Sequence, residues 1–349
     1  MLSHVIKCLY LAVLLLVGCD KADQQHSVHK EEFLAFGTLV NIVIYGESEQ
    51  KTHAAVKLAM EDFKQMHQAW NPWGQGMLGS INQAFAAEKS IEIDASISEL
   101  LLRSRLFNKT SHGFFDPAIG SLIKLWGFEE SELSVSTPPS SAKLTQYLAR
   151  PPRLSDVEES DLTIRSINPA VILDFGGVAK GFGVAQVADH LKNAGFKNFI
   201  VNAGGDLQVV GSKGEKPWVI GIRHPRDNGI LASIKIVGED SVFTSGDYER
   251  YFMAGGKRYH HILNPKTARP ARDFQSVTIV HPDAALADAA ATALFVAGKD
   301  NWVSIAKSMG VQQVMLVDSF GDVYITPQLQ QRIRFNDDAR WVKKIVSLQ

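Results

Sequence analysis

Residues 170–181 read Ala-Val-Ile-Leu-Asp-Phe-Gly-Gly-Val-Ala-Lys-Gly, and a helix-like stretch follows as far as Asn193. An apolar run, a glycine-rich turn and a helix in this order predict a strand–turn–helix unit. Glycine lets backbone amides approach a ligand closely, and the first turn of a helix adds free N–H groups and partial positive charge, so the unit favours a phosphorylated ligand. The spacing matches neither the Walker nor the dinucleotide-binding pattern. A tight connection without a ligand is therefore an equal alternative at this point.

The chain before this unit is predicted to contain a strand and two amphipathic helices. Residues 39–45 have the β-branched content of a strand, and apolar spacing predicts helices over 51–66 and 96–109. On the second helix we expect a buried side formed by Leu100, Leu101, Leu102, Leu106 and Phe107. Residues 129–161 are polar and contain four prolines. We expect a surface excursion there, with at most one short helix at 141–148.

The chain after this unit is predicted to be mostly strands. We expect residues 162–165 and 170–173 to pair as a hairpin, and 250–253 to pair with 258–263. Further strands are expected at 198–202, 206–210, 218–223, 230–237, 241–244, 276–280, 313–317 and 321–325. Helices are expected at 181–193, 283–297 and 301–309. This mixture indicates an α+β fold with mixed, largely antiparallel sheets and packed helices.

Composition narrows the class of protein. The chain has 349 residues, 45% of them hydrophobic and 21% charged, which is enough to bury a large core. Lys and Arg number 36 against 37 Asp and Glu, with no run of like charge. We therefore expect small-molecule or protein partners and no nucleic acid.

The N-terminus predicts an exported, lipid-anchored protein. The apolar run at 9–17 is too short to span a bilayer and is typical of a secretory signal. Residues 16–19, Leu-Val-Gly-Cys, resemble a bacterial lipobox, which makes 1–18 a lipoprotein signal peptide and Cys19 the lipidated residue; an ordinary signal with an incidental cysteine is the alternative. Asp20 resembles the retention signal of inner-membrane lipoproteins. We expect an inner-membrane lipoprotein facing the periplasm.

These signals also set the expected domain boundaries. Residues 19–32 form a lipidated tether, and 33–349 form the folded domain, as one unit or two closely packed subdomains. Cys8 and Cys19 are the only cysteines in the sequence. If Cys19 is acylated and Cys8 is cleaved away, the mature protein has no thiol chemistry.

Two further segments carry candidate chemistry. Asp288 and Thr292 are four residues apart on the predicted Ala-rich helix, so they share a face and offer the oxygen ligands that Mg²⁺ prefers. The alternative is a buried helix in which Asp288 caps a neighbour and Thr292 bonds back to the main chain. His260 and His261 are adjacent on a predicted strand, so at most one can serve a site on a given side. His261 as general base or phosphate contact competes with a purely structural histidine.

Taken in chain order, the segments resemble the ApbE-type FAD:protein FMN transferases. The resemblance rests on residues 36–38, 115–117, 125–128, 174–181, 202–207, 245–252, 260–270 and 288–292. It extends from Phe33 to the C-terminus. It implies an ApbE-like, T-fold-like architecture and an enzyme that binds FAD with Mg²⁺. Such an enzyme attaches FMN through a phosphoester to a Thr or Ser of an exported or membrane protein and releases AMP.

The resemblance also implies roles for individual residues. Metal ligands would be the side chains of Asp288 and Thr292, with main-chain oxygens of Ala179 and Ala291. The FAD pocket would be lined by Phe36, Trp73, Phe115, Asp116, Pro117, Gly176, Phe182 and Leu263. Lys180 would lie beside the phosphates and His261 would assist catalysis, with Asp174 and Asp247 as alternative bases.

Three positions depart from the family's usual pattern. Phe36 stands where Met is common, Asn264 where Asp is usual, and Ala268 where a turn glycine is usual.

Family analogy suggests acceptors such as a subunit of the sodium-pumping NADH:quinone reductase. The same metal and pocket would also serve an FAD pyrophosphatase, in which water replaces the acceptor hydroxyl. A flavin-binding lipoprotein without turnover is the third alternative.

Overall fold

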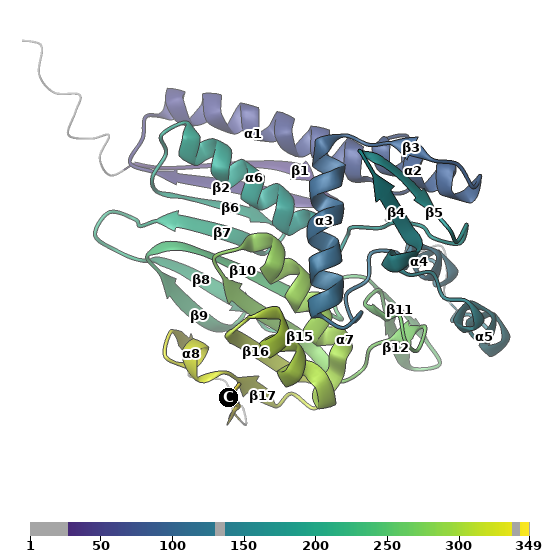
Figure 1. Ribbon diagram of the computed structural model, residues 1–349. Helices are drawn as coiled ribbons and strands as arrows, with labels where there is room; N and C mark the ends of the chain where they lie inside the picture. Colours follow the sequence, from purple (N-terminus) through teal and green to yellow (C-terminus); the bar gives the residue numbers. More distant parts are fainter. Residues whose placement is uncertain (1–26, 130–136, 337–342, 349) are drawn as a thin grey trace, which may run out of the picture.

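A nine-stranded sheet forms the centre of the protein in the computed structural model, which describes residues 27–129, 137–336 and 343–348 (Figure 1). Its strands, in spatial order, are β1 (Val28–Ala35), β2 (Thr38–Tyr45), β6 (Phe199–Ala203), β7 (Asp206–Gly211), β10 (Gly238–Gly246), β15 (Phe274–His281), β16 (Gln313–Asp318), β17 (Val323–Ile325) and β19 (Lys343–Ile345). Neighbours pair antiparallel except β17 and β19. The expected largely antiparallel α+β fold is confirmed. The predicted signal peptide 1–18 and Cys19 lie outside the described residues.

Helices cover one face of this sheet (Figure 1). They are α1 (Glu49–Trp70), α3 (Ala95–Thr110), α6 (Ala179–Asn193) and α7 (Ala284–Met309). The alternate residues Val40, Ile42 and Ile44 of β2 point into this layer and are fully buried. The alanines of α7 are buried too, and their small side chains let the helix lie close to the sheet. Gly298, at φ 71°, interrupts α7 where the sequence predicts the gap between two helices.

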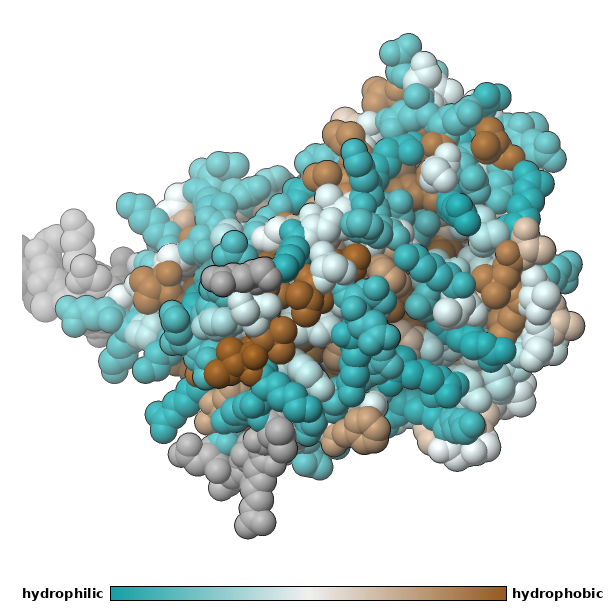
Figure 2. All heavy atoms as spheres, turned by 60° about the horizontal axis from the view of Figure 1, so that its bottom comes forward, coloured by the Kyte–Doolittle hydropathy of each residue, from teal (hydrophilic) through white to brown (hydrophobic). Residues whose placement is uncertain are grey.

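A smaller sheet packs on part of the opposite face. It consists of β18 (Ile333–Phe335), β9 (Ile230–Ile236) and β8 (Trp218–Arg223) in that order, and α8 (Pro327–Gln330) precedes β18. Trp218, Ile220 and Ile234 bury their side chains against Val209 and Val317 of the large sheet. The lower side of the molecule is mostly hydrophilic, with apolar groups in small patches (Figure 2). Among the described residues, no helix is both long and apolar enough to cross a membrane.

Shorter elements surround one end of the helical layer. They are α2 (Met77–Ala86), β3 (Ile91–Glu92), α4 (Gly120–Leu125), α5 (Ser141–Ala149), the 3-10 turn η2 (Leu154–Asp156), β4 (Val157–Ser160), β5 (Thr163–Ser166), β11 (Tyr251–Ala254), β12 (Lys257–His260), β13 (Leu263–Asn264) and β14 (Arg269–Pro270). The rings of Phe252 and Tyr259 stack at 5.4 Å, and Trp126 stacks on Tyr259 at 5.7 Å. This aromatic cluster fixes the β11–β12 hairpin, which the sequence predicted, beside α4.

The predicted hairpin of 162–165 with 170–173 is wrong. β5 pairs instead with β3 and β4, so 129–161 contains a strand as well as the expected helix. Residues 170–173 form no strand beyond a bridge between Ile172 and Ile119. The side chain of Asn82 accepts from the Leu173 N–H at 2.8 Å and donates to its carbonyl at 3.0 Å. A side chain distant in sequence therefore occupies the groups that a hairpin would have paired.

Two other expectations need correction. Leu102 and Leu106, placed on the buried side of α3, are 66% and 55% exposed, because only the stripe containing Leu100, Leu101 and Phe107 faces the core. The sheet also begins earlier than Phe33, since β1 starts at Val28 and pairs with Tyr45.

Candidate active site

The two halves of the predicted site meet where α6 begins against α7. The Gly181 N–H donates to Asp288 Oδ2 at 2.8 Å. A Cβ at Gly181 would lie 2.5 Å from the Ala284 carbonyl oxygen, so only glycine permits this approach of the two helices. Asp288 is 5% exposed, and its carboxylate lies at the positive end of α6.

Lys180 lies among three carboxylates. Its ammonium pairs with Asp206 at the start of β7, and Asp288 and Glu249 add to the negative field around it. Burial alone would lower the pKa of Lys180, but Asp206 and Asp288 outweigh burial and raise it. Asp206 is fixed in turn, because its Oδ1 accepts from the Thr244 N–H at 2.8 Å. Arg223 is a second cation near Glu249, and two cations against three carboxylates still leave a negative excess that a bound cation would balance.

Asp288 and Thr292 lie on the same face of α7, one turn apart. Burial raises the pKa of Asp288 to about 7 against the opposing effect of Lys180. The Thr292 hydroxyl lies 3.2 Å from the Ser245 hydroxyl of β10. A Cβ built at Gly177 would lie 3.4 Å from Thr292 Oγ1, so the glycine turn passes directly beside it. The Asp288 carboxylate and the hydroxyls of Thr292 and Ser245 thus lie in one region, and such hard oxygen donors fit Mg²⁺.

Two members of this oxygen-rich site were missed by the sequence analysis, Ser245 and Gly177. Gly181 is the third residue of α6, so its N–H has no carbonyl partner within the helix and donates to Asp288. Gly177 lies just before the helix, in the turn that passes Thr292. The glycine pair at 176–177 was the sequence feature that could have drawn attention to Gly177. The described residues contain no cluster of three or more His, Cys, Asp or Glu suited to a metal.

His261 and His260 point in different directions, as expected for adjacent residues. His260 is buried, and its Nε2 lies 2.6 Å from the Ala271 carbonyl oxygen. His261 is half-buried just beyond β12, with Nδ1 3.2 Å from the Arg250 carbonyl oxygen. Burial, followed by the nearby His260 and Arg250, lowers the pKa of His261 to about 3. His261 is therefore neutral at pH 7 and, with so low a pKa, a weak base.

The two alternative bases differ in their surroundings. Asp174 Oδ1 accepts from the Gly176 N–H at 2.7 Å, and burial raises its pKa despite the nearby Arg250. Asp247 is held by both terminal nitrogens of Arg226, at 2.6 and 2.7 Å, and by Arg258 at 3.2 Å. Its oxygens are engaged in ion pairs, so Asp247 is suited to fixing the β10–β11 connection and poorly suited to accepting a proton.

An aromatic wall lies on the other side of α6. Phe36 is in the β1–β2 turn at φ 51°, stacked on Trp70 with ring centroids 6.1 Å apart. Phe182 meets the edge of Trp70 at 6.4 Å, and Arg103 lies over the Phe182 ring at 5.4 Å. Phe36 and Phe182 are both half-buried, so their remaining surface is open to a planar ligand.

The other predicted pocket residues occupy three places. Asp174 and Gly176 are tied to the segment 115–117, because the Asp174 N–H donates to the Pro117 carbonyl at 2.7 Å. Asp116 holds the Ala118 and Leu154 N–H groups at 2.9 and 3.2 Å, and burial raises its pKa to about 6. Leu263 packs in the aromatic cluster of Trp126, while Trp73 is 36% exposed in the turn after α1.

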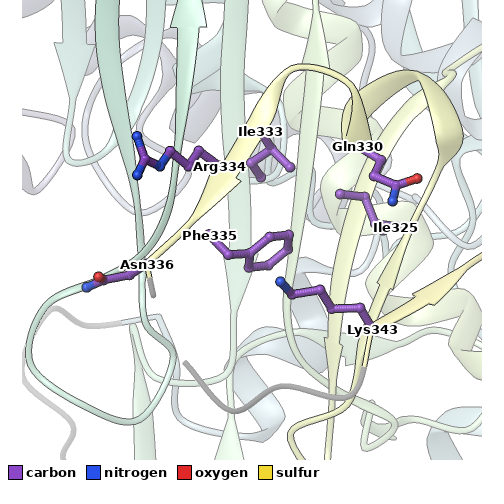
Figure 3. A pocket seen from close by; sticks show the side chains of 7 residues that line it. All are labelled: Ile325, Gln330, Ile333, Arg334, Phe335, Asn336 and Lys343. Atoms are coloured by element: carbon purple, nitrogen blue, oxygen red, sulfur yellow. The ribbon is translucent and has the colours of Figure 1, made fainter. Parts of the chain in front are cut away.

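Two surface cavities lie apart from these residues. The first, of about 450 Å³, lies at the β17–β19 end of the large sheet (Figure 3). It is lined by Ile325, Gln330, Ile333, Arg334, Phe335, Asn336 and Lys343. The second, of about 420 Å³, lies at the β1–β2 end, on the face opposite the helices.

Comparison with known proteins identifies a single set of relatives. A model of the ApbE family matches residues 36–316. An FAD:protein FMN transferase of Rhodobacter capsulatus is 39% identical over 307 residues, which cover 87% of this chain and 58% of that protein. An FAD:protein FMN transferase of Haemophilus influenzae is 29% identical over 276 residues, covering 77% of this chain and 79% of that protein.

Solved structures agree with these matches. The crystal structure of the ApbE protein from Thermotoga maritima superposes with a TM-score of 0.80 at 32% identity, covering 88% of this chain and 100% of that one. A mutant of the flavin transferase ApbE from Vibrio cholerae superposes with a TM-score of 0.76 at 25% identity, covering 88% and 99%.

Proposed function

Because this chain belongs to the ApbE family, we propose that it is a Mg²⁺-dependent FAD:protein FMN transferase. The observation that carries the proposal is the half-buried Lys180, which lies between the buried Asp206 and Asp288 at the glycine-rich start of α6. In the proposed reaction a Thr or Ser hydroxyl of an acceptor protein attacks the phosphorus on the FMN side of the FAD pyrophosphate. The bond from that phosphorus to the bridging oxygen breaks, and AMP leaves with the electron pair.

The metal would be held by Asp288 and Thr292 together with main-chain oxygens. We add Gly177 to Ala179 and Ala291 as a candidate main-chain ligand, because the glycine turn passes beside Thr292. Asp288 would be ionised when a cation is bound, since a nearby positive charge favours the carboxylate. The ion would supply charge neutralisation on the pyrophosphate oxygens.

The chain's own residues would position and stabilise the phosphates. Lys180 would turn its ammonium from Asp206 toward the pyrophosphate, and the free N–H groups of the glycine turn would add donors. His261 would take the acceptor proton or donate to a phosphate oxygen. The negatively charged pyrophosphate beside His261 would raise its pKa from about 3 toward a value useful for a base. Asp174 remains the alternative base.

The flavin would use the aromatic wall. We propose that half-buried Phe36 and Phe182 contact the flavin, and the family resemblance adds the segment 115–117, Trp73, Gly176 and Leu263 to the predicted pocket. We also propose that Cys19 is lipidated and anchors the enzyme to the inner membrane facing the periplasm. The lipobox-like residues 16–19 and Asp20 support this proposal. Acceptor proteins would then be exported or membrane redox subunits.

Incubating the protein with FAD, Mg²⁺ and an acceptor tests the activity. A suitable acceptor is the soluble domain of the sodium-pumping NADH:quinone reductase subunit that carries the flavinylated threonine. Transfer would add the mass of FMN to the acceptor, make its band fluorescent in a gel and release AMP. Free FMN with an unlabelled acceptor would contradict the transferase and support the pyrophosphatase. Intact FAD would support a passive flavin-binding protein.

A further inference from the structure

A groove lies on the face of the large sheet opposite the helices. Because Val40, Ile42 and Ile44 face the helices, Asn41 and Val43 of β2 point to this other side. The groove, of about 420 Å³, has a floor made by Asn41, Val43, Ile200, Asn202 and Leu207. One wall is formed by Lys30 and Glu32 of β1, and the other by residues 219–221 of β8.

One end of the groove reaches the candidate active site. Asn202 and Leu207 lie on either side of the turn that leads into Asp206, the partner of Lys180. Leu34 and Leu39 pair across β1 and β2 and lie on the groove side of these strands, just before the Phe36 turn. They are 81% and 44% exposed, which extends an apolar surface along the groove to the site.

The β8 wall of the groove has an open strand edge, and this edge also runs toward the candidate active site. In the described part of the chain, β8 is an outer strand of its three-stranded sheet, with β9 as its partner. Its last residue, Arg223, lies over the Tyr248 ring at 5.2 Å. Arg223 and Lys180 both lie near enough to Glu249 to oppose the rise that burial causes in its pKa. The β8 edge therefore runs toward the surroundings of Lys180.

We propose that this groove docks the acceptor protein, whose Thr- or Ser-bearing segment adds to β8 as an extended strand. The inference rests on the proposed function. A protein-modifying enzyme must bring a polypeptide hydroxyl to the phosphates, and the aromatic wall predicted for the flavin occupies the helical face. The groove approaches the same phosphates from the opposite face of the sheet. Strand addition supplies main-chain hydrogen bonds, while alternate side chains of the segment enter the groove over Val43, Ile200 and Leu207.

Lysine on an edge strand is a device that natural proteins use against strand addition, so Val219→Lys tests the groove. Val219 is 61% exposed, and Val237, outside the groove, is 70% exposed, which makes Val237→Lys a matched control. With the acceptor domain named above, we expect Val219→Lys to raise the KM for acceptor about tenfold or more, equivalent to about 1.4 kcal/mol. The KM for FAD should stay unchanged, and Val237→Lys should behave like the wild type. An acceptor KM within twofold of the wild type in Val219→Lys would overturn the proposal.

Hydrogen exchange provides a second measurement that needs no variant of the transferase. An acceptor domain with its threonine replaced by valine should slow exchange at residues 219–221 and leave β18 unaffected. Unchanged exchange at residues 219–221 would overturn the docking proposal. Protection that appears without acceptor and grows with the concentration of the transferase would assign the groove to a second copy of this chain, and it would overturn the proposal as well. If the wild type labels no acceptor, the proposed function itself fails; if it labels the acceptor without using the groove, only the docking proposal fails.

Discussion

Helix α6 has different neighbours on its two sides, and this difference determines how strongly a substitution on each side should disturb the protein. Toward α7 it meets Asp288 through a backbone N–H, and Lys180 balances the buried carboxylates of Asp206 and Asp288. On the β1 side it meets, across Gly183, the ring of Phe36 in the β1–β2 turn and the ring of Phe63 in α1. Backbone atoms and a buried carboxylate cannot move without disturbing their partners, whereas a ring can rotate or shift at modest cost. Single substitutions should therefore be severe on the α7 side and graded on the β1 side.

The largest effect is expected from Asp288→Asn. The amide oxygen can still accept from the Gly181 N–H, but the charge that would hold the cation is gone. We expect FMN transfer to fall about a thousandfold, together with loss of the stabilisation that Mg²⁺ gives in thermal unfolding. Asp300→Asn, exposed on the same helix, is the control and should change neither quantity. Retained Mg²⁺ stabilisation in Asp288→Asn would remove the oxygen-rich site from the mechanism.

Alanine at the two glycines of α6 compares the two sides directly. At Gly181 a Cβ would meet the Ala284 carbonyl at 2.5 Å, and at Gly183 it would meet a Phe36 ring carbon at 2.8 Å. We expect Gly181→Ala to reduce the free energy of unfolding by about 2 to 3 kcal/mol, because backbone must move. Gly183→Ala should cost less than about 1 kcal/mol, because ring movement is offset by better helix propensity, and it should mainly weaken FAD binding. Denaturant unfolding and FAD fluorescence titration measure these effects; equal destabilisation would refute the distinction.

The buried carboxyl of Asp116 should make stability depend on pH. Its pKa is raised from 3.8 to about 6 in the folded protein, chiefly by burial. The folded state binds the proton more tightly than the unfolded state. The contribution of protonated Asp116 to the free energy of unfolding is therefore fully present below pH 4 and is lost as pH rises through about 6. In the wild type we expect the free energy of unfolding to decline by about 1 to 3 kcal/mol between pH 4 and 7 because of this group, and Asp116→Asn should remove that decline. Urea unfolding across this range checks it, and an identical pH profile in the variant would contradict it.

The smallest effect is expected at Ala268. This residue is fully buried at φ 55°, a conformation that favours glycine, and the usual residue of the family's turn is glycine. Ala268→Gly should relieve backbone strain of about 1 kcal/mol. Part of that stabilisation should be offset, because the substitution also removes a buried methyl group. We expect the melting temperature to rise by one or two degrees at most. Any marked loss of stability would show that the methyl contact outweighs the strain.

The departures at the β13–β14 turn show how a sequence comparison and a structure complement each other. Asn264 replaces the usual Asp, yet its Oδ1 accepts from the Lys266 N–H at 2.8 Å, as a carboxylate oxygen would. The Ala268 carbonyl accepts from the Trp126 indole at 2.9 Å. The turn that contains both departures is therefore held by one local and one distant hydrogen bond.

The local sequence was sufficient for features that depend on neighbours in the chain. Periodicity located α1, α3, α6 and both parts of α7, and alternation located most strands, because burial of one face follows from spacing alone. The glycine-rich turn and the pair Asp288 and Thr292 were also visible, since their geometry is set within a few residues. Their roles as ligands remain predictions.

Tertiary structure alone decided which of these pieces meet. Asn82 displaces the expected hairpin at Leu173, and Asp206 comes to Lys180 from another strand. Gly177 and Ser245 join Thr292 only because α6, β10 and α7 pack together. Spacing in the chain fixes which side chains share a face, but long-range packing fixes which faces meet. A site assembled from α6 and α7, more than a hundred residues apart, therefore required the folded chain.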